Sequence, residues 1–191
     1  MGKITIVDKL TKRASLRALR KLANDDNYQF IKKCHLFQDV GPEALVFLME
    51  NVIERRYRRH ESVFQEGNPG ICLFLVKSGR VEIFTEEEDT AGERTVLAVV
   101  GEGRVLGELS VLSLTYRSSS ARAVDPGTTL LTLSSYDIDT LMDQHPHDGL
   151  KVLRGVTDTL AHNLIETNKR VRELQLELAR LRRAANGATD E

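Results

Sequence analysis

The chain has 191 residues, of which 41% are hydrophobic and 29% are charged, a composition typical of one globular domain with some additional helix. Its 27 lysines and arginines nearly balance 28 acidic residues, which argues against a protein that is basic throughout, so any DNA contact would be local. Two cysteines are too few for a disulfide scaffold, no apolar run approaches the ~20 residues of a membrane span, and the N-terminus lacks a signal-peptide core; we therefore expect a cytoplasmic protein without a membrane partner.

The first 51 residues show helical patterns. In residues 1–27, Leu10, Ala14, Leu19 and Leu22 recur at roughly helical spacing with basic residues between them, which predicts an amphipathic basic helical segment. We expect it to pack on its own domain or a dimer partner; the alternative is contact with nucleic acid or an anionic membrane. Residues 28–51 predict two short helices broken at Gly41, with the following proline beginning the second.

Residues 52–134 follow a different pattern, in which short apolar runs alternate with glycine-bearing turns such as EGNPG, KSG, GEG and DPG. The spacing leaves no room for crossover helices between the runs, which favours antiparallel pairing in a jelly roll. The eight predicted strands are VIERRYR, SVFQ, CLFLVK, RVEIFTE, RTVLAVV, RVLGE, SARAVD and TTLLTLS.

A long helix is predicted over residues 146–184, followed by a small polar tail at 185–191 that we expect to be disordered. Within the helix, residues step alternately by three and four, the spacing of a coiled-coil seam. We therefore expect a homodimer through residues 157–181; the alternative is a helix that lies on its own sheet. The seam residues are Thr157, Leu160, Leu164, Thr167, Val171, Leu174, Leu178 and Leu181.

The predicted fold is therefore mainly β with flanking helices (α+β). It consists of an antiparallel double-stranded β-helix or jelly roll over residues 28–145, N-terminal helices, and a long C-terminal dimerisation helix.

One segment of the roll, GELSVLSLTYRSSSARA at residues 107–123, sets a carboxylate (Glu108) and, nine residues later, a guanidinium (Arg117) among apolar and hydroxyl side chains. The segment resembles the phosphate-binding cassette of the cyclic nucleotide-binding domain family, whose form is Gly-Glu-Leu-Ala, a short helical stretch, and Pro-Arg-(Ala, Ser or Thr)-Ala. ESVFQEGNPGICLFLVKSGRVEIF and VLAVVGEGRVLGELS are similar to the strands and turns that precede that cassette. The alternative is a solvated Glu–Arg pair that caps a surface turn.

The resemblance covers roughly residues 28–184 and implies a ligand site. In the cassette it implies contacts from Gly107, Glu108, Leu109, Ser110, Arg117, Ser118 and Ser119. The run LAHNLIETNKRV is similar to the dimer helix of the family's catabolite activator protein-like regulators, in which a Thr-Ser pair reaches the adenine. The matching pair here is Thr167 and Asn168.

The chemistry of the cassette residues agrees with this resemblance. Arg117 offers a planar fork for the two exocyclic oxygens of a cyclic phosphate, and an ionised Glu108 accepts a hydrogen bond from the ribose 2′-hydroxyl. A short helix that begins near Glu108 would direct backbone N–H groups at the anion, and Ser118 adds a hydroxyl. Gly107 allows a close approach of the backbone.

Three positions depart from the family's form. Leu106 stands where Phe is usual, Tyr116 where Pro is usual, and Ser119 where Ala is usual, which puts the preorganisation of Arg117 and the base preference in doubt. Ser118 could hydrogen-bond guanine, yet Arg-Ser also resembles the bacterial cAMP-dependent activators. We expect cAMP as the ligand, with cGMP as the alternative.

We therefore expect a dimeric cyclic-nucleotide sensor that relays binding through its C-terminal helix to an unknown protein partner. Only about ten residues follow Leu181, which leaves no room for the helix-turn-helix of the family's transcription factors, so we expect no DNA binding. One alternative is a nucleotide-free scaffold and dimerisation module; another is a transcription regulator that uses the basic N-terminal helix. We expect no enzyme, no cofactor and no metal site, because Cys34-His35 and the histidines at 145 and 147 lack further ligands.

Overall fold

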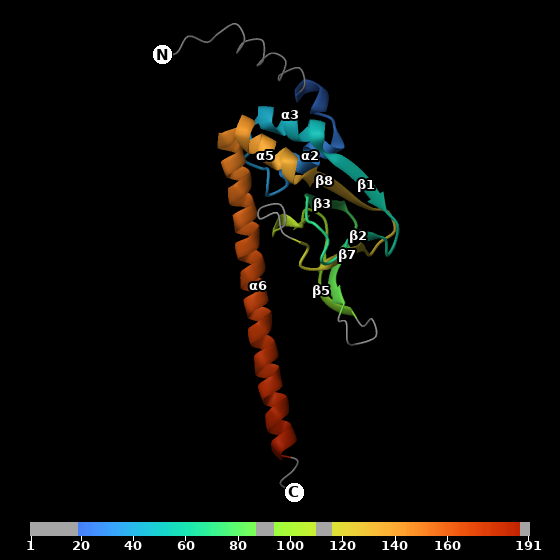
Figure 1. The fold of residues 1–191 in the computed structure, drawn as a ribbon, viewed down its shortest axis with the longest axis vertical. Helices are drawn as coiled ribbons and strands as arrows, with labels where there is room; N and C mark the ends of the chain where they lie inside the picture. The colour runs from blue at the N-terminus through green and yellow to red at the C-terminus, as the bar shows by residue number, and fades with distance from the viewer. Residues whose placement is uncertain (1–18, 87–93, 110–115, 188–191) are drawn as a thin grey trace. The chain divides into compact units, whose positions relative to one another are not determined.

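The computed structural model describes residues 19–86, 94–109 and 116–187. The chain forms two compact units, the first reaching Val152 and the second beginning at Leu153. The first unit contains short helices and two β-sheets, and the second is the main part of a long helix (Figure 1). No helix within the described ranges is both long and apolar enough to cross a membrane.

All eight predicted strands are present, and every strand pairing is antiparallel, which confirms the jelly-roll prediction. One sheet has the order β1-β8-β3-β6 and the other the order β2-β7-β4-β5, so each sheet joins strands that are distant in the chain. The strands are β1 (Ile53–Tyr57), β2 (Ser62–Phe64), β3 (Cys72–Ser78), β4 (Val81–Glu86), β5 (Arg94–Val100), β6 (Val105–Leu106), β7 (Ser120–Ala123) and β8 (Thr128–Ser134).

The two sheets enclose an apolar core. Alternation along each strand sends every second side chain inward, so that Ala121 and Ala123 are buried while the intervening Arg122 is not. Strand β8 is buried on both faces, because Leu130 faces this core and Leu131 faces the opposite way. The core residues are Tyr57, Phe74, Val76, Val81, Leu106, Ala121, Ala123 and Leu130.

In the described part of the chain, the short helices α2 (Asp26–Lys33), α3 (Pro42–Asn51) and α5 (Ser135–Gln144) accompany the sheets. They lie together near β1, β3 and β8 (Figure 1). Helix α3 begins at the predicted proline, whose missing N–H costs nothing at a helix start. Helix α5 begins with a capping box in which Ser134 and Asp137 each accept a hydrogen bond from the other's backbone N–H.

Helix α6 (Pro146–Gly187) is the predicted long helix, and it passes from the first unit into the second. Its first turn is tied to α3, because Asp148 Oδ1 accepts a 2.9 Å hydrogen bond from the backbone N–H of Gly41. The helix extends three residues past its predicted end, through 185–187, which the sequence analysis placed in the polar tail. The alanines at 184 and 185 are strong helix formers that favour this continuation.

Two other predictions concern residues outside the described ranges. Of the predicted N-terminal helical segment at 1–27, residues 19–22 are helical, and 1–18 lie outside the description. Residues 188–191 of the predicted tail also lie outside it.

Candidate functional site

The candidate site begins where β6 ends. Gly107 is the residue after β6, and its φ of +76° is a left-handed conformation that residues with a Cβ seldom adopt. The turn directs the chain away from β6, and Glu108 and Leu109, which follow it, are helical. Ser110 and the rest of the predicted short helix lie outside the described residues.

The backbone of Arg117 is held by the loop between β2 and β3. Its N–H donates a 2.8 Å hydrogen bond to the carbonyl of Asn68, and its carbonyl accepts one of 2.9 Å from the N–H of Gly67. Pro69 and Tyr116 form an isolated antiparallel bridge beside these bonds. The EGNPG turn therefore holds the backbone of Arg117 in place, although the turn is far from this arginine in the sequence.

Arg117 is only 5% exposed, and its guanidinium points toward aromatic rings of the roll. Nη2 donates a 2.6 Å hydrogen bond to the carbonyl of Cys72, and Nη1 donates a 3.3 Å hydrogen bond to the carbonyl of Gly107. Its Cζ lies 4.5 Å from the ring centroid of Phe64 and 5.5 Å from that of Phe74, distances suited to cation–π attraction. The side chain is thus held by two carbonyls and two aromatic rings.

Burial and charge act in opposite directions on this arginine. Burial lowers the pKa of the Arg117 guanidinium below its ordinary value, whereas Cys72 and Glu108 raise it in part. Glu108 is itself buried, with 9% exposure, and follows directly the glycine whose carbonyl accepts from Arg117. The structure thus brings together the two charged residues that the sequence analysis singled out, rather than exposing them as a solvated pair.

Gly107 has no side chain, and this allows the guanidinium of Arg117 to lie close to its backbone. A Cβ at this position would overlap Nη1 of Arg117 and lie 3.0 Å from its Cζ and 3.1 Å from the carbonyl oxygen of Cys72. The glycine therefore serves two purposes, since the positive φ and the close guanidinium both require it.

The remaining cassette residues surround this pair differently. Leu109 is 51% exposed and Ser118 is also exposed, whereas Ser119 is half-buried. Of the departures from the family's form, Leu106 is buried in the core at 3% exposure, and Tyr116 is 71% exposed. The leucine thus fills a core position, and the tyrosine packs against little of the first unit.

Thr167 and Asn168 lie on the part of α6 that belongs to the second unit. Both side chains are exposed on α6, and the Thr167 hydroxyl donates a 2.8 Å hydrogen bond to the carbonyl of Asn163, one turn earlier. Their predicted contact with the base stays a prediction.

The groups that hold Arg117 have little or no signal in the sequence. The carbonyl of Cys72 has no sequence signal, because every residue carries a backbone carbonyl. Phe64 and Phe74 had a weaker signal as apolar strand residues, but nothing in their spacing indicated that both rings face the same guanidinium. No group of three possible metal-ligating side chains occurs in the described parts of the chain.

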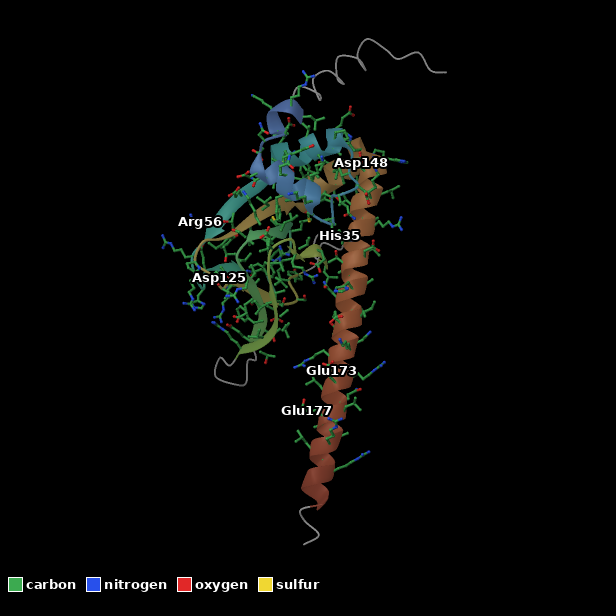
Figure 2. The ribbon with its side chains drawn as sticks, turned by 180° about the vertical axis from the view of Figure 1, so that it is seen from behind. His35, Arg56, Asp125, Asp148, Glu173 and Glu177 are labelled. Atoms are coloured by element: carbon green, nitrogen blue, oxygen red, sulfur yellow. The ribbon has the colours of Figure 1, made fainter. Side chains whose placement is uncertain are left out.

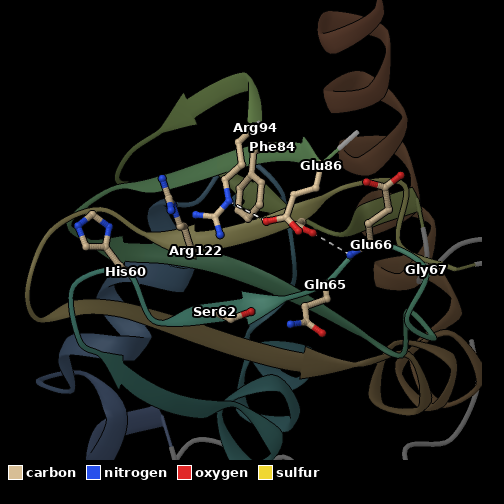
Figure 3. Close-up of a pocket in the computed structure, with 10 residues that line it drawn as sticks. His60, Ser62, Gln65, Glu66, Gly67, Phe84, Glu86, Arg94 and Arg122 are labelled. Carbon is tan, nitrogen blue, oxygen red and sulfur yellow. Dashed lines mark hydrogen bonds and ion pairs between the residues drawn. The ribbon is translucent and has the colours of Figure 1, made fainter. Parts of the chain in front are cut away.

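A hollow of about 970 Å³ lies on the outer face of the β2-β7-β4-β5 sheet (Figure 3). Its lining includes Phe84, whose ring centroid is 5.0 Å from Cζ of Arg94 and 5.2 Å from Cζ of Arg122. Arg122 pairs with Glu82 at 2.5 Å, and Arg94 pairs with Glu86 at 2.7 Å. Ser120 and Arg122 at the end of the 107–123 segment line this hollow, whereas Glu108 and Arg117 do not.

Comparison with known proteins agrees with this geometry. Residues 54–145 match the family model described as the cyclic nucleotide-binding domain. The cyclic AMP receptor protein of Thermus thermophilus is 33% identical over 149 residues, covering 78% of this chain and 62% of the relative. A CRP-like cAMP-activated global transcriptional regulator of Mycobacterium tuberculosis is 30% identical over 149 residues, covering 76% and 62%. The chain thus spans about three fifths of the length of these two curated relatives.

Solved structures show the same fold. The Thermus thermophilus catabolite activator protein has a TM-score of 0.61 with 31% identity, over 74% of this chain and 63% of that one. A cyclic nucleotide-binding domain from Methylobacillus flagellatus has a TM-score of 0.69 with 26% identity, over 76% of this chain and 83% of that one. Residues 54–145 of this chain therefore belong to the cyclic nucleotide-binding domain family.

Proposed function

We propose that the chain is a cytoplasmic sensor that binds cAMP in its cassette and relays binding through its C-terminal helix to a protein partner. The observation that carries the proposal is that two charged residues are buried in one place: Arg117 donates to the carbonyl of Gly107, and Glu108, the next residue, raises the pKa of its guanidinium in part. Buried charges are costly unless they have partners or a function, and perturbed buried groups gather at binding sites. The proposal includes no catalytic step.

The proposed ligand replaces weak partners of the arginine with a strong one. In the structure the Arg117 fork donates to two neutral carbonyls, those of Cys72 and Gly107. Two phosphate oxygens would accept charge-assisted hydrogen bonds, which are roughly twice as strong as neutral ones. Glu108 accepts from the ribose 2′-hydroxyl, and the exposed Ser118 hydroxyl and the helical N–H groups after Gly107 donate to the phosphate.

The affinity expected from this chemistry is moderate. A ligand of about 22 heavy atoms at roughly 0.3–0.4 kcal/mol per atom gives about 7–9 kcal/mol, which corresponds to roughly micromolar binding. We favour cAMP over cGMP because both curated relatives described above are named for cAMP. Thr167 and Asn168 are the residues that we expect to contact the base from the helix.

The relay requires the long helix to pair with a second copy. Five apolar residues of its seam are exposed: Leu164, Val171, Leu174, Leu178 and Leu181 are between 46% and 62% exposed. A regular stripe of this kind is buried when two helices wrap around each other. A nucleotide shifts such a pair only by the difference between its affinities for the two arrangements of the helices.

Titration calorimetry with cAMP tests the binding proposal. We expect Arg117→Lys to weaken binding at least about tenfold, because a lysine offers no planar fork. Arg122→Lys is the matched control, since this arginine lies on β7 but pairs with Glu82 on the outer face, and we expect it to bind as the wild type does. Equal affinity of the wild type and Arg117→Lys, or no binding by the wild type, would refute the proposed role.

Titration with 2′-deoxy-cAMP tests the carboxylate separately. The wild type should bind 2′-deoxy-cAMP more weakly than cAMP, because the deoxy ligand lacks the hydroxyl that donates a hydrogen bond to Glu108. In Glu108→Ala the two ligands should bind alike. If the wild type does not discriminate between them, the role of this carboxylate is refuted while that of the arginine stands.

A second function is favoured by one observation: the Arg117 guanidinium already has acceptors in two backbone carbonyls. A roll in which this arginine is a structural residue would serve as a nucleotide-free scaffold and dimerisation module. A thermal-shift measurement separates the two functions. A sensor is stabilised by saturating nucleotide, by about 2.7 kcal/mol at a hundredfold excess over Kd, and a scaffold is not.

A further inference from the structure

The buried arginine of the cassette and an exposed arginine of the same unit contact different kinds of group. On the surface, Arg80 pairs with a carboxylate, that of Asp125, at 2.8 Å; Figure 2 labels this aspartate. The guanidinium of Arg117 instead donates to two neutral backbone carbonyls and lies over two phenylalanine rings. The rings therefore take part in stabilising a charge that has been removed from water.

Phe64 on β2 and Phe74 on β3 supply these rings, one from each sheet. Their centroids are 5.7 Å apart with 28° between the ring planes, and Cζ of Arg117 lies 4.5 Å from the first and 5.5 Å from the second. Phe74 is 8% exposed and Phe64 is half-buried. Cation–π attraction is strongest where water is excluded in this way.

A ring stabilises a buried cation differently from a carboxylate. Burial is the largest influence on the pKa of the Arg117 guanidinium and lowers it, so the charged form needs support. The face of a ring attracts the cation but does not accept its in-plane N–H groups as a carboxylate does. Two of the five N–H groups donate to the carbonyls of Cys72 and Gly107. Support from the rings thus leaves donors for an anionic ligand.

The same contacts keep the guanidinium where the cassette begins. Nη1 donates to the carbonyl of Gly107, which directly precedes the helical residues of the cassette. The backbone of Arg117 is bonded to Gly67 and Asn68, in the loop that follows the strand of Phe64. The side chain and the backbone are therefore held by the same part of the roll.

We propose that Phe64 and Phe74 are positioning residues, which keep the charged fork of Arg117 at the cassette so that a cyclic phosphate meets it already in place. The inference rests on the proposed function, because the phosphate is that of the nucleotide. The apparent affinity of a ligand falls with the fraction of protein in the binding-competent conformation, and a loosened arginine reduces this fraction. Phe64 has the larger effect, because its ring is closer.

The test changes the charge distribution of a ring and leaves its size almost unaltered. In the full chain, Phe64 is replaced by phenylalanines that carry one, two or three ring fluorines, which withdraw electron density from the ring face and weaken its attraction for a cation stepwise. Titration calorimetry with cAMP gives Kd for each protein, and urea unfolding verifies that each is as stable as the wild type.

We expect Kd to rise with each fluorine and to be at least about threefold above the wild-type value with three fluorines. The same series at Phe74 should give a smaller rise. A residue that only fills space would show no such trend, because the fluorinated rings are similar in size and remain apolar.

Phe84 is the matched control, since it also meets two guanidinium groups but on the outer face of the roll. Its ring centroid is 5.0 Å from Cζ of Arg94 and 5.2 Å from Cζ of Arg122, and Figure 3 shows the three side chains together. Fluorination of Phe84 should leave Kd for cAMP unchanged.

The possible failures are distinguishable. If the wild type binds cAMP and Arg117→Lys weakens binding, but Kd does not depend on fluorination of Phe64, the inference is wrong and the proposed function stands. A Kd that falls with fluorination also overturns the inference, because the rings would then hold the arginine away from the ligand. An equal rise in the Phe84 series overturns it as well. If the wild type binds no cyclic nucleotide, the proposed function fails and the inference fails with it.

Discussion

Replacing Gly107 by alanine tests whether the close approach of Arg117 stabilises the roll. The new Cβ would have to sit in a left-handed backbone conformation, which costs about 1–2 kcal/mol. It would also overlap Nη1 of Arg117 and so displace the guanidinium from the carbonyls of Cys72 and Gly107. Hydrogen bonds to a charged group contribute about 1.5–3 kcal/mol each, and partial rearrangement of a flexible side chain reduces the loss.

The structure offers a control that isolates the backbone cost. Gly103 has φ of +80°, close to that of Gly107, but a Cβ there would have nothing within 4 Å. Gly103→Ala should therefore cost only about 1–2 kcal/mol, and Gly107→Ala about 2–3 kcal/mol more. Urea unfolding followed by far-ultraviolet circular dichroism measures both free energies of unfolding.

A double-variant cycle assigns the excess to the arginine. In an Arg117→Ala background the overlap with the guanidinium disappears and only the 3.1 Å approach to the Cys72 carbonyl oxygen remains, so adding Gly107→Ala should cost little more than Gly103→Ala costs in the wild type. If the two glycine variants are equally destabilised in the wild type, the reasoning from the close approach is wrong. The same conclusion follows if the excess cost persists without the guanidinium.

Three further predictions follow from contacts elsewhere in the chain. Ser134→Ala removes the capping box of α5 and should lower the free energy of unfolding by about 1 kcal/mol, measured by urea titration. Partial burial raises the pKa of Asp148, but hydrogen bonds from Lys151 and the Gly41 N–H outweigh it, so the folded pKa lies below its ordinary value. The wild type should therefore have a higher free energy of unfolding than Asp148→Asn above about pH 4. This difference should vanish as pH falls through the folded pKa, and acid titration of unfolding measures it. Leu174→Glu/Leu178→Glu places like charges on the seam and should halve the mass measured by light scattering.

Each of these three has a result that would count against it. An unchanged urea midpoint for Ser134→Ala would mean that the cap contributes nothing measurable. A difference between the wild type and Asp148→Asn that stays constant down to pH 2 would contradict the lowered pKa. A wild type that is already monomeric would refute the dimer, whatever the variant does.

Periodic patterns in the sequence were sufficient to predict the secondary structure and the fold class. All eight strands occur where apolar runs alternate with glycine turns, and α3 begins at Pro42 as expected. Such patterns are local: the side chains that form them are neighbours within a few residues, and one strand or turn of helix determines which face they share. The residue pair Glu108 and Arg117 could also be predicted, since a charged residue in an apolar segment stands out.

Only the tertiary structure determined what those two residues contact. Arg117 bonds to the carbonyl of Cys72, which is 45 residues away, and the N–H of Gly41 bonds to Asp148, which is 107 residues away. The backbone groups in these contacts are identical in every residue, so no sequence pattern can reveal which of them will be used. Their selection depends on how β3, β6 and the β2–β3 loop come together, which is decided by packing of the whole roll.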